Sequence, residues 1–502
     1  MPKVAGNEFK NQPNQRRSRW ILFLILATGG LWGSGGLAVG LAATWHVAPA
    51  GSDRASGQVD APFATLDRAE TAAEPGDEIL LHTGRHHTGR GGFRARKAGE
   101  AGRPIILRAE NPGSVVLTTG ETLAGFEPYR GHLYRAKLDR HPSAAVQDGD
   151  PLYHRWEMPF TGPDDPNLQR GGWHWAEGYF YLWPWDNEDP RQHRIVVSFS
   201  SVVEVQATCS HRVWEGLVFE HGSYGLHWNS RDARHHEVRN CVFRNASNGI
   251  GGAPDTLIEH CTFHNLGPST WEHGIYDGHE NTVIRYNHFE RIAGGGVHLY
   301  KTPVAATVCH NSFGPPMTDR VHKPGQVGLY VFGRGHQVHH NVIYGGHRIG
   351  MDLTAPDCLV SENTIVGTTV AGLLVAGDPK GTRVTNNLVV AAGGLAVEAR
   401  KHPEFMDGNV YAGPGEWKFL GRELKTFAAW QQISGADRAG VWMTKCLFAD
   451  SRQADFRLAP ATVRELAKLR RARSADGVGR GPGAVSSGKA WPPTGVNFVW
   501  QP

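Results

Sequence analysis

The stretch Val338-His-His-Asn-Val-Ile343 is one copy of a short motif that recurs along the second half of the chain. The motif is an apolar residue, two variable residues, Asn or Cys, another variable residue and a final apolar residue. Its other copies begin at Val238, Ile258, Ile284, Val308, Val360 and Val384. A second motif, glycine followed by an apolar residue, lies between the copies and begins at Gly225, Gly249, Gly274, Gly296, Gly328, Gly350, Gly372 and Gly394. Because self-similarity at a fixed period is the mark of a repeat architecture, the chain is predicted to form a solenoid.

The length of the repeat identifies the kind of solenoid. Successive glycines of the second motif are 24, 25, 22, 32, 22, 22 and 22 residues apart, and the intervening runs alternate without a helical pattern. These features predict stacked coils of short strands. Leucine-rich repeats share the period, but their leucine signature is absent. A single coil cannot bury its apolar face, so we expect neighbouring coils to stack and share one core.

The Asn or Cys position of the first motif predicts a ladder inside the solenoid. We expect the amides to bond from coil to coil, as stacked amide side chains do in other repeated strands. The predicted ladder consists of Cys241, Cys261, Asn287, Asn311, Asn341, Asn363 and Asn387. Its two cysteines are interpreted as small buried thiols, and a disulfide between them remains an alternative.

These coils resemble the right-handed parallel β-helix of the pectate-lyase-like superfamily of exported carbohydrate-active proteins. Residues 45–53 and 62–79 are similar to the N-terminal cap of exported β-helix proteins, and residues 171–193 resemble the β-rich insert of β-helix glycoside hydrolases. Residues 407–458 are similar to the usual C-terminal end of the fold. The resemblance implies an all-β fold, a right-handed parallel β-helix built as a single-stranded solenoid, with an N-terminal cap and a β-rich insert.

The predicted organisation has five parts. Residues 1–43 form a signal peptide or membrane anchor, 44–115 the N-terminal cap and first coils, 116–202 the β-rich insert, 203–400 the β-helix core with its groove, and 401–502 the C-terminal coils, cap and tail.

The N-terminus carries an export signal. Lys10, Arg16, Arg17 and Arg19 precede an apolar run that continues to Ala43. Cleavage near Ala42 would release the mature chain at Thr44, whereas retention of residues 20–43 would anchor the protein in the inner membrane. Both alternatives predict an exported protein, periplasmic or extracellular.

Composition excludes some partners. The net charge is only +4, and lysines and arginines form no long blocks, so a nucleic-acid partner is not expected. The six cysteines show no CxxC pair and no zinc-binding spacing. We predict a monomer without a cofactor. A divalent cation has no support, because the cluster of groove carboxylates with which calcium-dependent pectate lyases bind their metal is missing from the sequence.

The resemblance implies a catalytic groove on the outer face of the sheet that the glycine motif forms. Since side chains alternate along a strand, the second residue after each glycine points outward. These residues are His227, Gly251, Tyr276, His298, Tyr330, Asp352, Leu374 and Ala396. The fourth residues are Asn229, Ala253, Gly278, Tyr300, Phe332, Thr354, Ala376 and Glu398. Polar and aromatic side chains gather in the middle coils, which favours a site over ordinary stacked surface residues.

The stretch Trp271-Glu-His-Gly-Ile-Tyr-Asp-Gly-His279 breaks the repeat within this region. Asp277 occupies a position that is apolar in the other coils, so either the strand ends there or a buried acid is held by a partner. His279 or His298 is the expected partner. The first three residues, Trp271, Glu272 and His273, are predicted to end the turn that leads into the strand.

Basic residues border the predicted groove. The longest coil carries additional residues 314–325, which include His322, and we expect this loop to overhang the next groove strand. Lys301 and Arg334 follow two groove strands directly. Each is an ordinary surface base when taken alone, but together they suit an acidic substrate.

The favoured hypothesis is β-elimination or epimerisation of a uronic-acid polysaccharide, which needs a carboxylate-neutralising donor, a base, and an acid for the leaving oxygen. The candidate catalytic residues are Tyr276, Asp277, His279, His298, Tyr300 and Lys301, and the candidate substrate-binding residues are His227, Trp271, Glu272, His273, His322, Tyr330, Arg334 and Asp352. The run Asp277-Gly-His279 resembles the Asp-x-His motif of β-helix alginate epimerases, but Tyr276 abuts the aspartate directly.

Two alternatives remain. Glycoside hydrolysis needs two carboxyl groups about 5–9.5 Å apart. Asp352 lies three coils from Tyr276, or ~14 Å, and Glu272 and Asp277 lie within a single turn. The other alternative is a non-catalytic sugar-binding β-helix, in which the insert's tryptophans, such as Trp173 and Trp185, stack on sugar rings instead of forming a hairpin core.

Overall fold

The computed structural model describes residues 42–154, 162–165, 168–228, 230–300, 303–320, 325–446 and 448–473. Residues 1–41 of the predicted leader and residues 474–502 of the C-terminal tail lie outside these residues. Among the residues described, no helix is both long and apolar enough to cross a membrane.

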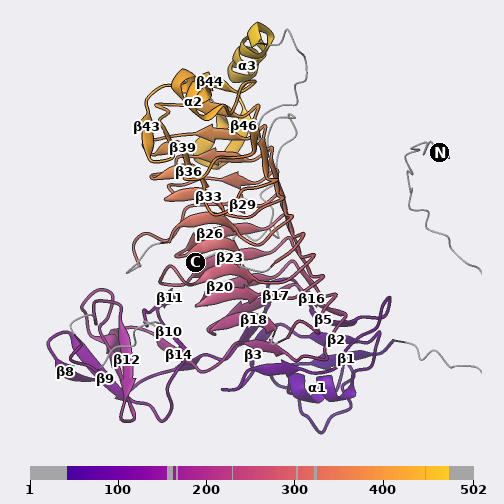
Figure 1. Ribbon diagram of the computed structural model, residues 1–502. Helices are drawn as coiled ribbons and strands as arrows, with labels where there is room; N and C mark the ends of the chain where they lie inside the picture. Colours follow the sequence, from indigo (N-terminus) through magenta and orange to yellow (C-terminus); the bar gives the residue numbers. More distant parts are fainter. Residues whose placement is uncertain are drawn as a thin grey trace, which may run out of the picture. The chain divides into compact units, whose positions relative to one another are not determined.

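Three twelve-stranded sheets form the solenoid, and each complete coil contributes one strand to each sheet (Figure 1). The strands built from the glycine motif form the groove sheet, in which all neighbours but the last pair are parallel. Its order is β4 (Phe93–Ala95), β15 (Val203–Val205), β18 (Tyr224–Trp228), β21 (Asn248–Gly251), β24 (His273–Asp277), β27 (Gly295–Leu299), β30 (Val327–Val331), β33 (Ile349–Leu353), β36 (Ala371–Val375), β39 (Leu395–Ala399), β42 (Trp417–Phe419) and β43 (Arg422–Leu424). The predicted parallel β-helix is confirmed.

The first motif spans the other two sheets, with the Asn or Cys position at the corner between them. The second sheet has the order β1 (Thr44–Val47), β2 (Glu78–Leu81), β5 (Ile105–Ala109), β16 (Arg212–Glu215), β19 (Glu237–Arg239), β22 (Leu257–Glu259), β25 (Val283–Arg285), β28 (Thr307–Cys309), β31 (Gln337–His339), β34 (Leu359–Ser361), β37 (Arg383–Thr385) and β40 (Phe405–Asp407). The third sheet has the order β3 (Gly84–His87), β6 (Val115–Thr118), β17 (Leu217–Glu220), β20 (Val242–Ala246), β23 (Thr262–Leu266), β26 (His288–Ile292), β29 (Ser312–Phe313), β32 (Val342–Ile343), β35 (Thr364–Val366), β38 (Leu388–Val390), β41 (Val410–Ala412) and β44 (Val441–Met443).

The core of the solenoid contains a column of stacked side chains. Phe219, Phe243, Phe263, Phe289 and Phe313 come from successive strands of the third sheet, and their rings stack at 4.7–4.9 Å between centroids. This spacing matches the distance between parallel strands, so each ring packs on its neighbours and none faces water.

Helices cover the two ends of this core. Helix α1 (Leu66–Ala72) buries Leu66 and Ala69 in it, and its first turn is capped by the Thr65 hydroxyl, which accepts a hydrogen bond from the Arg68 amide. Helix α2 (Phe427–Ser434) buries Trp430 at the other end. The C-terminal segment also contains β45 (Phe448–Asp450), η2 (Ser451–Gln453), β46 (Asp455–Leu458) and α3 (Pro460–Arg473).

The predicted amide ladder is confirmed, and it is longer than expected. The Asn311 side-chain amide donates to the side-chain oxygen of Asn341, Oδ1, at 3.0 Å, and the same contact repeats along the following coils to Asn409. Asn409 then donates to the buried Asp437 carboxylate at 2.8 Å. All six cysteines lie within the described residues and are free thiols, so no disulfide joins the two at the head of the ladder.

The β-rich insert forms two antiparallel sheets. One has the order β11 (Asp150–Pro151), β10 (Ala144–Gln147), β14 (Ile195–Ser198) and β7 (Glu121–Thr122); the other has β12 (Trp173–Ala176), β13 (Tyr179–Leu182), β9 (Leu133–Lys137) and β8 (Glu127–Arg130), and η1 (Pro190–Gln192) precedes β14. Trp173, Phe180 and Trp185 are buried together in a separate core. These two tryptophans therefore belong to a hairpin core and are not exposed sugar platforms.

Candidate active site

A single outward-facing column runs along the groove sheet. The parallel register aligns Arg94, Glu204, His227, Gly251, Tyr276, His298, Tyr330, Asp352, Leu374, Glu398 and Lys418. From His227 to Leu374 this is the column expected from the sequence.

The prediction for the coil that begins at Gly394 is wrong by two residues. Leu374 pairs with Glu398, so Glu398 joins the column in place of Ala396. The reason is that Gly394 lies in the turn before β39, whereas the glycines of the preceding coils lie within their strands.

An aromatic cluster surrounds His298 at the centre of the column. The His298 ring lies 5.2 Å from the Tyr276 ring, 4.5 Å from the Tyr330 ring and 5.5 Å from the Tyr300 ring, measured between centroids. The Phe332 ring lies 5.2 Å away. The imidazole is only 9% exposed although it belongs to the outer face of the sheet.

Glycine makes room for this cluster. A side chain on Gly295, at the start of β27, would place its Cβ 2.7 Å from the Tyr330 ring. Such a contact is too close for any side chain, so only glycine lets the Tyr330 ring lie over this strand. The same Cβ would come within 3.3 Å of His273, whose ring is buried next to His298.

The two histidines form a neutral, hydrogen-bonded pair. His298 Nδ1 and His273 Nε2 are 3.1 Å apart. Burial lowers the pKa of His298 to about 4, and burial together with His298 places the pKa of His273 well below its ordinary value. The remaining ring nitrogen of His298, Nε2, is buried and has no hydrogen-bond partner among the described residues. An unpaired buried nitrogen is costly, and a chemical or binding role would account for it here, in the middle of the outward-facing column.

The tyrosines of the cluster are hydrogen-bond donors at neutral pH. Burial raises the pKa of Tyr276, and Tyr300 raises it further through its charge and a side-chain hydrogen bond. Burial raises the pKa of Tyr330 to about 12, with the neighbouring Asp352 carboxylate adding to the effect. Both hydroxyls therefore keep their protons at pH 7.

Two carboxyl groups with different surroundings follow the cluster. Burial raises the pKa of Asp352 to about 6, although the Thr354 hydroxyl donates to it at 3.1 Å. Glu398 accepts a hydrogen bond from Arg400 at 2.9 Å and lies 4.0 Å from Lys418. The two acidic residues are two strands apart, which corresponds to ~9.6 Å.

A second polar group lies at the N-terminal end of the column. His227 Nδ1 is 3.1 Å from the Glu204 carboxylate, and the Tyr224 ring stacks on the His227 ring at 4.6 Å. Sequence reasoning missed Glu204 because β15 precedes the first copy of the glycine motif. Its signal is the alternation Val203-Glu204-Val205, which is typical of a strand with one buried face.

Asp277 points away from the groove and contacts His279. It is level with Leu299 of the next coil and is 0% exposed, so its side chain faces the core. Its carboxylate accepts a hydrogen bond from the His279 amide at 3.0 Å and lies 3.3 Å from His279 Nδ1. It fits because the preceding coil has Gly252 beside it, where a Cβ would come within 2.4 Å of the carboxylate. The expected partner is thus His279, not His298, and the pair holds a turn.

The residues before this strand are divided between the surface and the interior. Trp271 is 59% exposed. Glu272 is 3% exposed, and its carboxylate accepts hydrogen bonds from the amide and hydroxyl of Ser269, within its own turn. Burial raises the pKa of Glu272 to about 7. His273 does not end the turn as expected; it begins β24 and supports His298.

The basic residues predicted at the groove have different positions. Arg334 is exposed, and its guanidinium lies 3.5 Å from the Asp357 carboxylate. Lys301 and His322 lie outside the described residues. Arg348, which precedes β33, is exposed and close enough to Tyr330 to favour ionisation of that hydroxyl, so it opposes the rise in the tyrosine's pKa.

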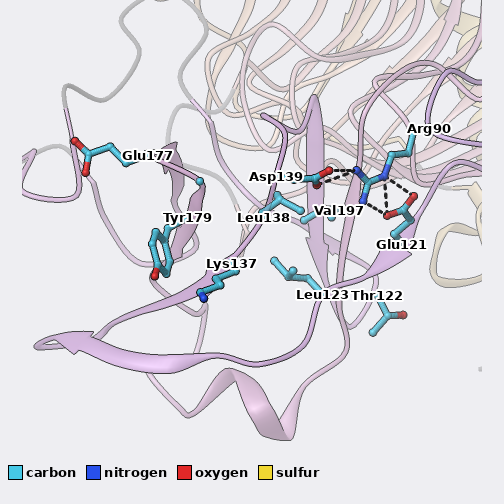
Figure 2. A pocket seen from close by; sticks show the side chains of 11 residues that line it. Arg90, Glu121, Thr122, Leu123, Lys137, Leu138, Asp139, Glu177, Tyr179 and Val197 are labelled. Atoms are coloured by element: carbon cyan, nitrogen blue, oxygen red, sulfur yellow. Dashed lines mark hydrogen bonds and ion pairs between the residues drawn. The ribbon is translucent and has the colours of Figure 1, made fainter.

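A separate cavity of about 620 Å³ lies on the insert and the first coils, lined in part by Lys137 and Tyr179 (Figure 2). Figure 2 shows its arginine, Arg90, between Glu121 and Asp139, to which it donates at 2.8–3.0 Å. Since two carboxylates already neutralise the charge of this arginine, the cavity is less suited than the groove to bind an anionic sugar.

Comparison with known proteins supports the fold. Residues 194–343 match the family model described as the right handed beta helix region. A solved structure named "Glycoside hydrolase" aligns over 84% of this chain and 100% of its own, with a TM-score of 0.53 and 12% identity. The chain has the right-handed parallel β-helix fold of the pectate-lyase-like superfamily.

Other relatives of this β-helix cover less of it. The structure of XylC in complex with xylose aligns over 70% of this chain and 69% of its own, with a TM-score of 0.50 and 14% identity. The pectate lyase PEL9 of Emericella nidulans is 39% identical over 85 residues, which are 17% of this chain and 20% of the lyase. At these levels the solved structures establish the fold alone.

Proposed function

We propose that this β-helix is an exported enzyme that acts on a uronic-acid-containing polysaccharide by β-elimination or epimerisation in the groove centred on His298. The observation that carries the proposal is the Nε2 atom of a neutral, buried imidazole, which lacks a partner within the described residues and lies among tyrosine side chains. The local identity to a pectate lyase adds support.

Both reactions begin by removing the proton next to the uronate carboxylate. In the arrangement proposed here, His298 Nδ1 donates to His273, which leaves the lone pair of Nε2 as the proton acceptor. Because Nε2 is buried, the sugar reaches it after a neighbouring ring, Tyr276 or Tyr330, rotates. Rotamer changes of partly exposed side chains are fast compared with typical turnover.

The tyrosine hydroxyls supply the acid. Because Tyr276 and Tyr330 keep their protons at neutral pH, either can donate to the glycosidic oxygen as it leaves, or to the opposite face of the sugar in an epimerisation. Arg348 is close enough to Tyr330 to influence its pKa, and in this proposal its guanidinium neutralises the uronate carboxylate.

The test uses the chain from Thr44 with alginate, pectate, hyaluronan, chondroitin, heparin and neutral xylan, each with calcium and with a chelator. Ultraviolet absorbance of an unsaturated uronate and new reducing ends are followed together. Both signals rising support a lyase, and solvent-proton exchange into the polymer without either signal supports an epimerase. A sugar that binds without any of the three changes would overturn the proposal in favour of a binding protein.

Glycoside hydrolysis is the second candidate, and the Asp352–Glu398 pair favours it. Their strands are ~9.6 Å apart, just above the range of about 6.5–9.5 Å between the carboxyl groups of inverting enzymes. Asp352 has the raised pKa of a general acid, and Glu398 is held by Arg400 and Lys418. New reducing ends without ultraviolet absorbance would select this reaction, and Asp352→Asn should then remove the activity.

A further inference from the structure

The corner between the second and third sheets carries two outward columns of side chains next to the amide ladder. The residues just before each ladder position adopt a left-handed backbone conformation, with φ between 53° and 60° for Asn240, His260, Tyr286, His310 and His340. Rings in this column stack: the centroids of His260 and Tyr286 are 5.2 Å apart, and those of His310 and His340 are 4.8 Å apart. The second column consists of the residues that end the strands of the second sheet.

Two neighbouring coils place ligands typical of metal sites at this corner. Cys309 and His339 are paired in register between β28 and β31, and each is followed by a histidine of the stacked column. Ligand atoms of Cys309, His310 and His339 all lie within 4.8 Å of one another. His340 Nδ1 is 2.9 Å from His339 Nδ1, so a fourth imidazole adjoins the group.

The burial of these side chains and the contacts around them are typical of a metal site. Cys309 is 7% exposed, and the histidines are half-buried, which leaves a path from solvent. A bound ion would displace the proton of the Cys309 thiol. Glu362 lies 2.7 Å from His340 Nε2, a carboxylate–histidine contact of the kind that orients metal ligands.

We propose that Cys309, His310 and His339 bind one thiophilic transition-metal ion, Zn²⁺ being the best match, with water or His340 in the fourth position. A thiolate with two or three imidazoles is a ligand set that zinc prefers. In a tetrahedral site the ligand atoms, which now lie within 4.8 Å of one another, would move to about 3.4–3.6 Å apart. The ion would join β28 and β31. In the sequence, β28 precedes and β31 follows the additional residues 314–325 of the longest coil. This corner is separate from the groove, so the proposal is independent of the reaction.

The test is calorimetric titration of the metal-free chain from Thr44 with Zn²⁺, together with the absorbance spectrum after Co²⁺ is added. We expect one ion per chain and a thiolate-to-cobalt band. Cys309→Ser should remove that band, and His339→Ala and His310→Asn should each weaken Zn²⁺ binding by about 100-fold or more. His260→Asn is the matched control, because His260 has the same backbone conformation two coils away and is exposed.

Thermal unfolding separates metal binding from misfolding. The metal-free variants should melt close to the metal-free parent chain, and Zn²⁺ should raise the melting temperature of the parent and of His260→Asn alone. Failure of the parent chain to bind Zn²⁺ or Co²⁺ would overturn the proposal. Binding that survives Cys309→Ser with an unchanged cobalt spectrum would overturn it as well.

Discussion

Two polar columns run along the same solenoid, and they differ in almost every respect. From Asn311 to Asn409 the ladder column inside repeats one residue, asparagine, and each buried amide is hydrogen-bonded to the next. The groove column outside changes residue at every coil, from Tyr276 to His298, Tyr330 and Asp352. Its central imidazole keeps a nitrogen without a partner in the described part of the chain, and its acid and tyrosines have shifted pKa values.

The difference shows how polar side chains that stabilise a repeat protein can be told apart from polar side chains that serve its function. A stacked fold is stabilised when every coil supplies the same polar side chain, because each side chain can then form hydrogen bonds to its equivalents in the coil before and the coil after it. A column that departs from the repeat and leaves a polar atom unpaired gives up part of that stability. Departures of this kind concentrate at functional sites.

The largest expected effect is on activity. His298→Gln should lower kcat/KM by roughly 10²–10⁴-fold, because it removes the proton acceptor while keeping a polar side chain of similar size. Turnover is measured on the polysaccharide that the assay above identifies, and circular dichroism melting checks the fold. A variant that keeps full activity would show that the groove column is merely a second structural column.

The ladder should respond in stability. Asn341→Ala removes the acceptor of the Asn311 amide and the donor to the Val308 carbonyl, and leaves both groups buried. With about 1–3 kcal/mol for each unsatisfied group, the free energy of unfolding should fall by about 3 kcal/mol or more. Urea denaturation measures it, with Asn386→Gly as the control, since Asn386 lies beside the ladder in a backbone conformation that glycine tolerates. Equal losses in the two variants would contradict the assigned role.

The next effect depends on pH and concerns Glu272, in the turn before the groove strand β24. The folded pKa of Glu272, about 7, lies above its ordinary value of 4.5, so the folded chain binds more protons between these values. Its contribution to stability therefore falls as pH rises from 4.5 to 7, and the loss is complete above 7. Glu272→Gln should be more stable than the parent at pH 8 by about 3 kcal/mol and equal to it at pH 4. Urea melts at both pH values test this; a difference independent of pH would rule it out.

The smallest effect concerns a residue of the groove strand that faces inward. Asp277→Asn should change kcat/KM by less than about threefold, since the side chain contacts His279 and the core, not the groove. Steady-state kinetics beside His298→Gln measure this. A loss as large as that of His298→Gln would restore Asp277 to the catalytic residues and shift the site toward the interior of the coil.

Sequence periodicity was sufficient for the fold and for the middle of the groove column. It failed at Glu398. Gly394 fits the glycine motif, but it lies two residues before the position that corresponds to the motif glycine in the other groove strands. The sequence also placed Asp277 in a position that is apolar in the other coils, and the structure confirms that its side chain faces inward. Adjacent residues of a strand point to opposite faces, and the inward position of Asp277 depends on Gly252 in another coil.

The sequence by itself determined the parallel β-helix, the amide ladder and the outward position of His298. All three follow from the repeated motifs, and each copy of a motif lies within the sequence of a single coil. Only the tertiary structure decided which side chains meet. The His273–His298 pair, the Asp352–Glu398 spacing and the cluster of Cys309 with His310 and His339 each join different coils. Their contacts depend on the register between coils and on the space that glycines leave, which no single stretch of sequence records.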